Sequence, residues 1–292
     1  MRLDQDSSRL LGEARIGMLA LHAGGLPLVN PAAFSYQGGS VWITTSRYAA
    51  KFALARRDPR AAFLVEARGR SVELQGLLEP YDVRSVSGAL RAAADAPSFG
   101  FGMAAYTLKN AGFIGGYLVD LVGIPREWWP WNRVVIRLRV DRYRTLVADL
   151  PPKAARSTLE GLPVAVGRSL ETQGTGYLCW DRKGYPSLAP AMWAAAGADV
   201  ACWLPGGIGA VPRDRTPACL VVESHHRYRA TRMLGACVRG VLHRDESARD
   251  LIAERYGVEV EGGAGLRLAA RRVTHWRGFG VATTTVGARV AS

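Results

Sequence analysis

Residues 16–45 read IGMLALHAGGLPLVNPAAFSYQGGSVWITT, and residues 175–204 read TGYLCWDRKGYPSLAPAMWAAAGADVACWL. The two stretches align without a gap at a constant offset of 159 positions. The matched pairs include Gly17 with Gly176, Leu19 with Leu178, Gly25 with Gly184, Pro27 with Pro186 and Pro31 with Pro190. A unit of this length is too long for a solenoid repeat. The alignment predicts a duplicated domain, and differences between the two copies become evidence about function.

The repeat also shows where the two copies differ in length. The offset of 159 returns at Gly76 and Gly235, whereas IRLRVDRYR at 136–144 matches LRLAARRVT at 266–274 at an offset of 130. The first copy therefore carries about 29 extra residues (159 minus 130) before its last strand. These extra residues fall in an Ala-rich, mostly helical segment at about 83–131.

Each copy contains short strand patterns separated by Gly and Pro turns, with few helices. This pattern favours two small, mainly antiparallel β-barrels over a parallel α/β sheet. In the first copy, strands are expected at 16–22, 27–36, 40–45, 61–66, 70–79 and 133–145, with a helix over 46–57. We place the domains at 1–147, including the helical and Trp-rich insertion, and at 148–292, where a polar segment with a Pro pair begins.

Composition limits the function classes. The chain of 292 residues is 48% hydrophobic and 22% charged, which suits two ordinary globular domains. Its net charge of +13 comes mainly from scattered arginines, so we expect no nucleic-acid partner. The N-terminus has no apolar signal region, and Asp120 interrupts the most apolar stretch, 112–124. We expect a cytoplasmic protein without a membrane partner that acts on a small molecule.

The cysteines and histidines give no recognisable metal or nucleophile motif. All four cysteines lie in apolar runs of the second half without a CxxC pair, so we expect buried, free thiols and no metal site. They are Cys179, Cys202, Cys219 and Cys237. Among the histidines, His225 and His226 end a strand near the expected meeting point of the barrels, and they are axial-ligand candidates if the protein binds haem.

The segment 41–66 contains the most specific chemistry. A strand ends in Thr44-Thr45-Ser46-Arg47 and leads into a helix that carries Lys51. Hydroxyls, free amides at a helix N-terminus and two cations together suit a phosphate group. The structural alternative is ordinary helix capping by Thr45 or Ser46, with Lys51 in solvent.

The ordered set of these elements resembles the pyridoxamine 5′-phosphate oxidase-like, FMN-binding split-barrel superfamily. The resemblance is carried by Gly17-Met18-Leu19, Gly25-x-Pro27, Thr44 to Lys51, Arg57-Asp58-Pro59-Arg60 and Arg70 to Gly76. It implies two tandem split β-barrels that form an intramolecular pseudo-dimer, in a mainly β (α+β) fold. It also implies that Thr44, Ser46, Arg47 and Lys51 hold a flavin phosphate at the interface between the barrels, with Thr45 beside them.

The second copy departs from that pattern. At an offset of 159, Thr44 becomes Trp203, Ser46 becomes Pro205 and Lys51 becomes Ala210. We therefore expect a degenerate second phosphate site and one cofactor per chain. Trp193, the counterpart of Phe34, is expected to help wall the cofactor slot.

The first copy departs from the superfamily as well. It has Arg70-Ser71 where relatives that act on pyridoxamine phosphate carry a glutamine after the arginine, so we do not expect that reaction. The leading hypothesis is an FMN-dependent oxidoreductase acting on a small organic molecule. The alternatives are a haem-binding or F420-binding split barrel, or a binding protein without catalysis. The cluster Trp128-Trp129-Pro130-Trp131 would line a planar ligand or serve as packing mass.

Overall fold

The structure is a computed structural model, and it describes residues 3–67, 69–208, 211–225 and 229–286. The first half forms a closed barrel with the strand order β1-β2-β3-β6-β5-β4. The strands are β1 (Ile16–Ala23), β2 (Leu26–Gln37), β3 (Ser40–Ser46), β4 (Arg60–Ala67), β5 (Arg70–Tyr81) and β6 (Arg133–Val147). Alternate apolar side chains of these strands fill the barrel, with Leu19, Phe34, Ile43 and Ile136 fully buried in one cluster.

The second half repeats this connectivity. Its strands are β7 (Gly176–Arg182), β8 (Tyr185–Ala196), β9 (Asp199–Leu204), β10 (Thr216–Ser224), β11 (Leu234–Arg244), β12 (Ala264–Arg277) and β13 (Gly280–Thr285). The ring β7-β8-β9-β12-β11-β10 closes because β10 also pairs with β7. Strand β13 pairs with the C-terminal half of β12. The predicted fold class, two tandem barrels in a mainly β protein, is confirmed.

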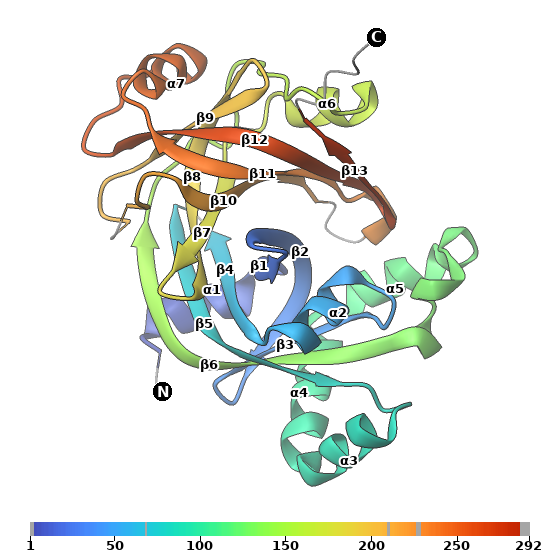
Figure 1. The fold of residues 1–292 in the computed structure, drawn as a ribbon. Coiled ribbons are helices and arrows are strands. Elements are labelled where there is room, and N and C mark those ends of the chain that lie inside the picture. Colours follow the sequence, from blue (N-terminus) through green and yellow to red (C-terminus); the bar gives the residue numbers. More distant parts are fainter. Residues whose placement is uncertain (1–2, 68, 209–210, 226–228, 287–292) are drawn as a thin grey trace.

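Short helices decorate the barrels. They are α1 (Gln5–Glu13), α2 (Ala50–Arg57), α3 (Val86–Ala94), α4 (Ala96–Lys109), α5 (Ala111–Val119), α6 (Val164–Leu170) and α7 (Ala248–Tyr256), with 3-10 turns η1 (Leu121–Gly123), η2 (Arg126–Trp128), η3 (Pro130–Asn132) and η4 (Ala230–Arg232). The segment from α3 to η3 is inserted between β5 and β6, and its helices project from one end of the first barrel (Figure 1). None of the helices in the described ranges is long and apolar enough to cross a bilayer.

Strand registers correct one detail of the repeat. The bulge in β5 falls between Gln75 and Gly76, and the matching bulge in β11 falls between Arg239 and Gly240. A side chain at either bulge glycine would meet a carbonyl oxygen of the neighbouring strand at 1.9 Å. Gly240 is therefore the counterpart of Gly76, and the sequence match of Gly76 with Gly235 is wrong. The second copy is longer than the first in the segment before β11, and an alignment at a fixed offset does not allow for this difference.

The two barrels pack through reciprocal faces. Strand β8 of the second barrel lies against β1, β4 and β5 of the first, and β2 of the first lies against β7, β10 and β11 of the second. These are the same contacts with the copies exchanged, as in an isologous dimer. Apolar residues of the first barrel, including Met18, Val29 and Leu64, join the core cluster of the second barrel. The expected intramolecular pseudo-dimer is present. The four cysteines are free and buried within the second half, as predicted.

Candidate functional site

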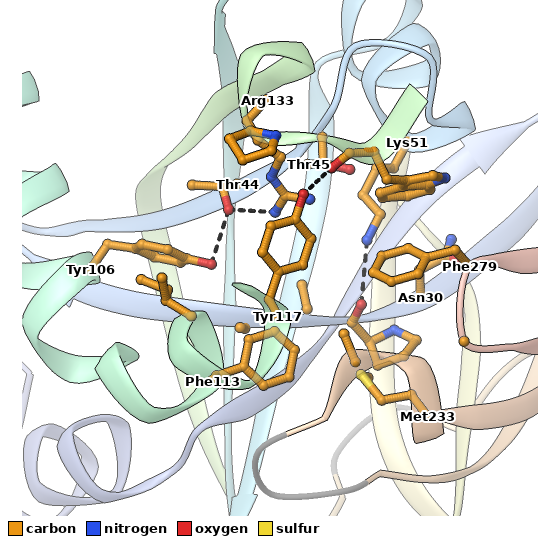
Figure 2. A pocket seen from close by; sticks show the side chains of 18 of the residues that line it. Asn30, Thr44, Thr45, Lys51, Tyr106, Phe113, Tyr117, Arg133, Met233 and Phe279 are labelled. Carbon is orange, nitrogen blue, oxygen red and sulfur yellow. Dashed lines mark hydrogen bonds between the residues drawn. The ribbon is translucent and has the colours of Figure 1, made fainter. Parts of the chain in front are cut away.

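A cavity of about 350 Å³ lies where three parts of the chain meet. Strands β2 and β3 and helix α2 of the first barrel form one side, α4 and α5 of the insertion form another, and η4 with the β12–β13 hairpin of the second barrel closes the third. Figure 2 shows side chains from all three parts turned toward one space. This volume falls within the range of small-molecule sites in proteins. The cavity lies between the two copies, and the insertion completes its wall.

Aromatic side chains form the apolar part of the cavity. They are Phe113, Tyr117, Trp128, Trp276 and Phe279. The Trp128 and Phe279 rings lie 5.0 Å apart between centroids, so the insertion and the second barrel are in direct contact here. Trp129 and Trp131 instead pack edge to face against each other. Of the tryptophan cluster noted in the sequence, Trp128 lines the cavity. Rings arranged around one space suit a flat, apolar body.

The polar end of the cavity is built on β3 and β6. Arg133 Nη2 donates a hydrogen bond of 2.6 Å to Thr44 Oγ1, and Thr44 Oγ1 donates one of 3.0 Å to the Tyr106 hydroxyl (Figure 2). The Arg133 guanidinium also lies 5.7 Å from the centroid of the Tyr117 ring. Pairing of β3 with β6 brings Thr44 and Arg133 together although 89 positions separate them. Thr44 and Tyr117 thus hold the guanidinium at the cavity.

Lys51 supplies a second cation to the same end. It projects from α2 into the cavity, where Nζ donates a hydrogen bond of 3.3 Å to the Pro31 carbonyl (Figure 2). Burial, and secondly the charge of Arg133, lower the pKa of Lys51 to about 8. No Asp or Glu lines the described part of this cavity. Two cations without a facing carboxylate make the site suited to an anion.

Thr45 adds an unsatisfied hydroxyl. It is 1% exposed, lines the cavity, and its Oγ1 has no hydrogen-bond partner among the described residues. A buried hydroxyl without a partner is costly, and a ligand atom or a water molecule would satisfy it.

Ser46 and Arg47 are engaged elsewhere. Ser46 Oγ donates to the Glu127 carbonyl and accepts from the Tyr48 amide, while Arg47 forms an ion pair with Asp82. Neither residue lines the cavity. Asp82 directly precedes the insertion and Glu127 belongs to its turn η2, so this part of the chain engages two side chains that the sequence pattern assigns to a phosphate. The amides before α2 are also occupied, because the Arg47 and Ala49 amides donate to the carbonyls of Asn132 and Ser46.

Trp193 lies inside the second barrel and not at the cavity. Its side chain is fully buried, its indole Nε1 donates a hydrogen bond of 2.9 Å to the Gln173 carbonyl, and Arg255 lies 3.7 Å over its ring. Its counterpart Phe34 is likewise a core residue of the first barrel. Trp193 therefore does not line this cavity, contrary to the expectation that it helps wall the cofactor site. Its side chain faces the interior of its own barrel, as does that of its counterpart Phe34.

The second copy has no counterpart of the Lys51 helix in its described residues. Between β9 and β10 the described residues 205–208 and 211–215 form turns and irregular chain without a helix. Ile208 is buried there, and its carbonyl accepts a hydrogen bond of 2.8 Å from Arg144 Nη1 of the first barrel. Ala210 lies outside the described residues.

Of the two histidines considered as haem ligands, His225 lies apart from this cavity. His225 lines a different cavity and hydrogen-bonds Glu223 at 2.8 Å, which is the main reason why its pKa is raised. His226 lies outside the described residues. No histidine lines the described part of the cavity at Lys51.

The sequence pattern therefore points to three of the polar residues that line the cavity and does not indicate others. Thr44, Thr45 and Lys51 all line this cavity, and so do Arg133, Tyr106 and Tyr117, which the sequence pattern does not single out. The missed residues belong to the insertion and its junction with β6, for which the repeat offers no counterpart. The sequence places Arg133 at the start of a predicted strand, but the pairing of that strand with the Thr44 strand is seen only in the structure.

Comparison with known proteins agrees with the resemblance. Residues 4–98 match the family model described as pyridoxamine 5′-phosphate oxidase, which confirms the resemblance for the first barrel. No curated protein matches the chain.

Solved structures with a similar fold each cover about half of this chain. A FAD-binding protein from Mesorhizobium loti is 18% identical, with a TM-score of 0.32, over 49% of this chain and 94% of its own. An F420 reductase is 19% identical, with a TM-score of 0.33, over 49% and 98%. General Stress Protein 26 from Bacillus anthracis is 16% identical, with a TM-score of 0.32, over 50% and 94%.

Proposed function

We propose that this chain, whose residues 4–98 match the pyridoxamine 5′-phosphate oxidase family, binds FMN in the cavity at Lys51 and uses it as an oxidoreductase on a small organic molecule. The observation that carries the proposal is the composition of the cavity. One end has two cations, Lys51 and Arg133, and no carboxylate among its described lining residues, while the other end is aromatic. A flat ring system that carries a phosphate matches both ends.

The polar end fits a phosphate group. Lys51 would supply a point charge, Arg133 would supply a planar pair of donors, and the unpartnered hydroxyl of Thr45 would gain a hydrogen bond. Thr44 is a positioning residue, since it holds Arg133 and is itself hydrogen-bonded to Tyr106. Ser46 and Arg47 play no part in this arrangement, because both are bonded to the insertion.

The apolar end fits a planar ring. The side chains of Trp128 and Phe279 would contact its faces or edges and exclude water from it. When bound, FMN supplies hydride or electron transfer, which no protein side chain provides. The role of the protein is to bind the cofactor, to neutralise the charge of its phosphate and to shape the space left for a substrate. This assignment gives one cofactor site per chain.

Titration with FMN tests the proposal. The purified protein should quench flavin fluorescence with a stoichiometry of one FMN per chain. Lys51→Ala should weaken affinity roughly 10- to 150-fold, since a hydrogen bond to a charged group is worth about 1.5–3 kcal/mol. Arg213→Ala removes an exposed arginine of the second copy and should change nothing. Equal losses in both variants, or two FMN per chain, would contradict the assignment.

Parallel titrations with FAD and F420 separate the flavin-type cofactors. If F420 binds more tightly than FMN and Lys51→Ala weakens its binding, the proposed site is correct and F420 is the cofactor in place of FMN. A Soret band after reconstitution with haemin, with no FMN affinity, would overturn the proposal.

A further inference from the structure

A second cavity, of about 250 Å³, lies between the barrels at the other end of β6. Residues of β5 and β6 line it from the first barrel, and the turn between β7 and β8 lines it from the second. Arg133 begins β6 at the Lys51 cavity, whereas Arg142 and Arg144 lie near the end of this strand. The two cavities share no lining residue.

The floor of this second cavity is a satisfied polar network. Glu73 is 1% exposed, and it accepts hydrogen bonds from Arg144 Nε, from the Leu188 amide at 2.5 Å and from Gln75 Nε2 at 3.2 Å. Arg144 also donates to Ser187 Oγ at 2.8 Å. The charges of Glu73 and Arg144 therefore cancel, and this pair joins the barrels and leaves no free carboxylate at the cavity.

The rim carries three further cations. Arg142 Nε donates a hydrogen bond of 2.7 Å to Gln75 Oε1, and its guanidinium lies 4.5 Å from the centroid of the Tyr185 ring. Arg182 and Lys183 line the cavity and have no side-chain partner among the described residues. With Glu73 neutralised by Arg144, the lining keeps a charge of +3 from these rim residues.

Lys183 has a positive backbone φ angle, a conformation that glycine adopts more readily than lysine. Lys183 and Gly184 form the two-residue turn between β7 and β8, with φ values of 54° and 80°. The turn of the first copy has Gly24 and Gly25, with φ values of 62° and 81°. Such turns favour glycine or asparagine, because a β-carbon crowds the backbone at positive φ. A lysine is less favourable than glycine in this conformation, and it places an ammonium group at the rim of the cavity.

The rim cations at the turn are specific to one face of the pseudo-dimer. At the offset of 159, Arg182 corresponds to Ala23 and Lys183 to Gly24, so the symmetry-related turn has no cation at either position. The duplication alone does not account for the cluster.

We propose that this cavity binds a small phosphorylated anion through Arg142, Arg182 and Lys183, with Gln75 positioning Arg142. Convergence of three cations on a concave surface with no free carboxylate raises the local concentration of anions. Phosphate oxygens accept hydrogen bonds from both guanidinium and ammonium groups. This proposal is independent of the proposed flavin function, since it uses different residues.

Calorimetric titration with pyrophosphate at low ionic strength tests the site. The parent protein is Lys51→Ala, so that the cation at the first cavity does not contribute. In this background, Lys183→Gly and Arg182→Ala should each weaken pyrophosphate binding about fivefold, the usual scale for an exposed charge pair. The control is Arg249→Ala, which removes an exposed arginine of α7 and should leave affinity unchanged.

The Lys183→Gly variant separates binding from folding. Glycine suits the positive φ, so this variant should be at least as stable to heat as its parent while it binds pyrophosphate more weakly. Unchanged affinity in both Lys183→Gly and Arg182→Ala would overturn the proposal, as would equal weakening in Arg249→Ala. Absence of pyrophosphate binding by the parent would overturn it as well.

Discussion

His22 Nε2 lies 3.1 Å from Oδ2 of Asp181, the residue that holds the position of His22 in the second copy. The other ring nitrogen lies 3.1 Å from Asp58 Oδ2. A residue that faces its own counterpart is expected close to a two-fold axis. The pair therefore places the pseudo-symmetry axis near the β1–β2 and β7–β8 turns. It also shows that the two copies have diverged into a complementary acid and base.

Loss of this contact should loosen the packing of the barrels slightly. Asp181 is 41% exposed at its side chain, so we expect Asp181→Ala to lower the free energy of unfolding by at most about 1 kcal/mol. Urea denaturation measures the change, and 1 M NaCl should remove most of it because salt screens exposed charges. Asp141→Ala, at an exposed aspartate of β6, is the control. A loss that persists in high salt would mean that charge is not the cause.

The insertion is anchored at Gly102 of α4. A β-carbon there would lie 2.2 Å from the Trp42 ring, whereas one at Gly100 of the same helix would meet nothing within 4 Å. Gly102→Ala should therefore cost about 1–3 kcal/mol through overpacking and displace the helix that carries Tyr106 to the cavity. Gly100→Ala should instead stabilise the protein by roughly 0.5–1 kcal/mol through helix propensity.

Thermal denaturation and FMN titration of these two variants give the readouts. Gly102→Ala should lower both stability and affinity, while Gly100→Ala should leave affinity unchanged. Equal stability of the two variants would show that α4 does not need close contact with Trp42.

The lowered pKa of the buried Lys109 should make the stability of the fold depend on pH. Its Nζ donates to the Leu11 carbonyl at 2.6 Å and lies 3.7 Å from the centroid of the Phe34 ring. Burial, and secondly Arg15, lower the pKa of Lys109 from 10.5 to about 7. Between these values the unfolded chain binds one more proton than the folded chain, so stability rises with pH across that window.

Urea titrations between pH 6 and pH 10 test this sign. Lys109→Met should flatten the rise, and Lys51 should still contribute a rise from about pH 8. Lys153→Met, at an exposed lysine, should keep the slope of the wild type. If Lys109→Met keeps the full slope, the titrating group lies elsewhere.

The repeat made the barrels predictable because strand alternation is local. Each copy carries its own alternating pattern, so the closed rings follow from residues close together in the sequence. The counterparts Phe34 and Trp193 were correctly paired, but they face the two barrel interiors, since an inward position in one copy is inward in the other.

The cavity was less predictable because the insertion builds much of it. Arg47 belongs to a phosphate-binding pattern in the sequence, yet Asp82, at the start of the inserted segment, withdraws it into an ion pair. Arg133 becomes a site residue only through the register of β3 with β6. Contacts of this range depend on tertiary packing, for which a single sequence gives no signal.

Lys51 should make FMN affinity depend on pH. Its pKa of about 8 in the free protein means that it is mostly charged at pH 7 and about one-tenth charged at pH 9. The phosphate of FMN is already doubly charged in this range, because its second pKa is about 6. If the charged amine binds the phosphate, apparent affinity should fall about tenfold between pH 7 and pH 9.

Fluorescence titrations with FMN across this range measure the fall. Lys51→Met should bind weakly and with no slope in the same window, since a guanidinium group does not titrate there. Lys109→Met should keep the slope, because Lys109 does not line the cavity. A slope that survives in Lys51→Met would assign the pH dependence to another group and would remove Lys51 from the phosphate site.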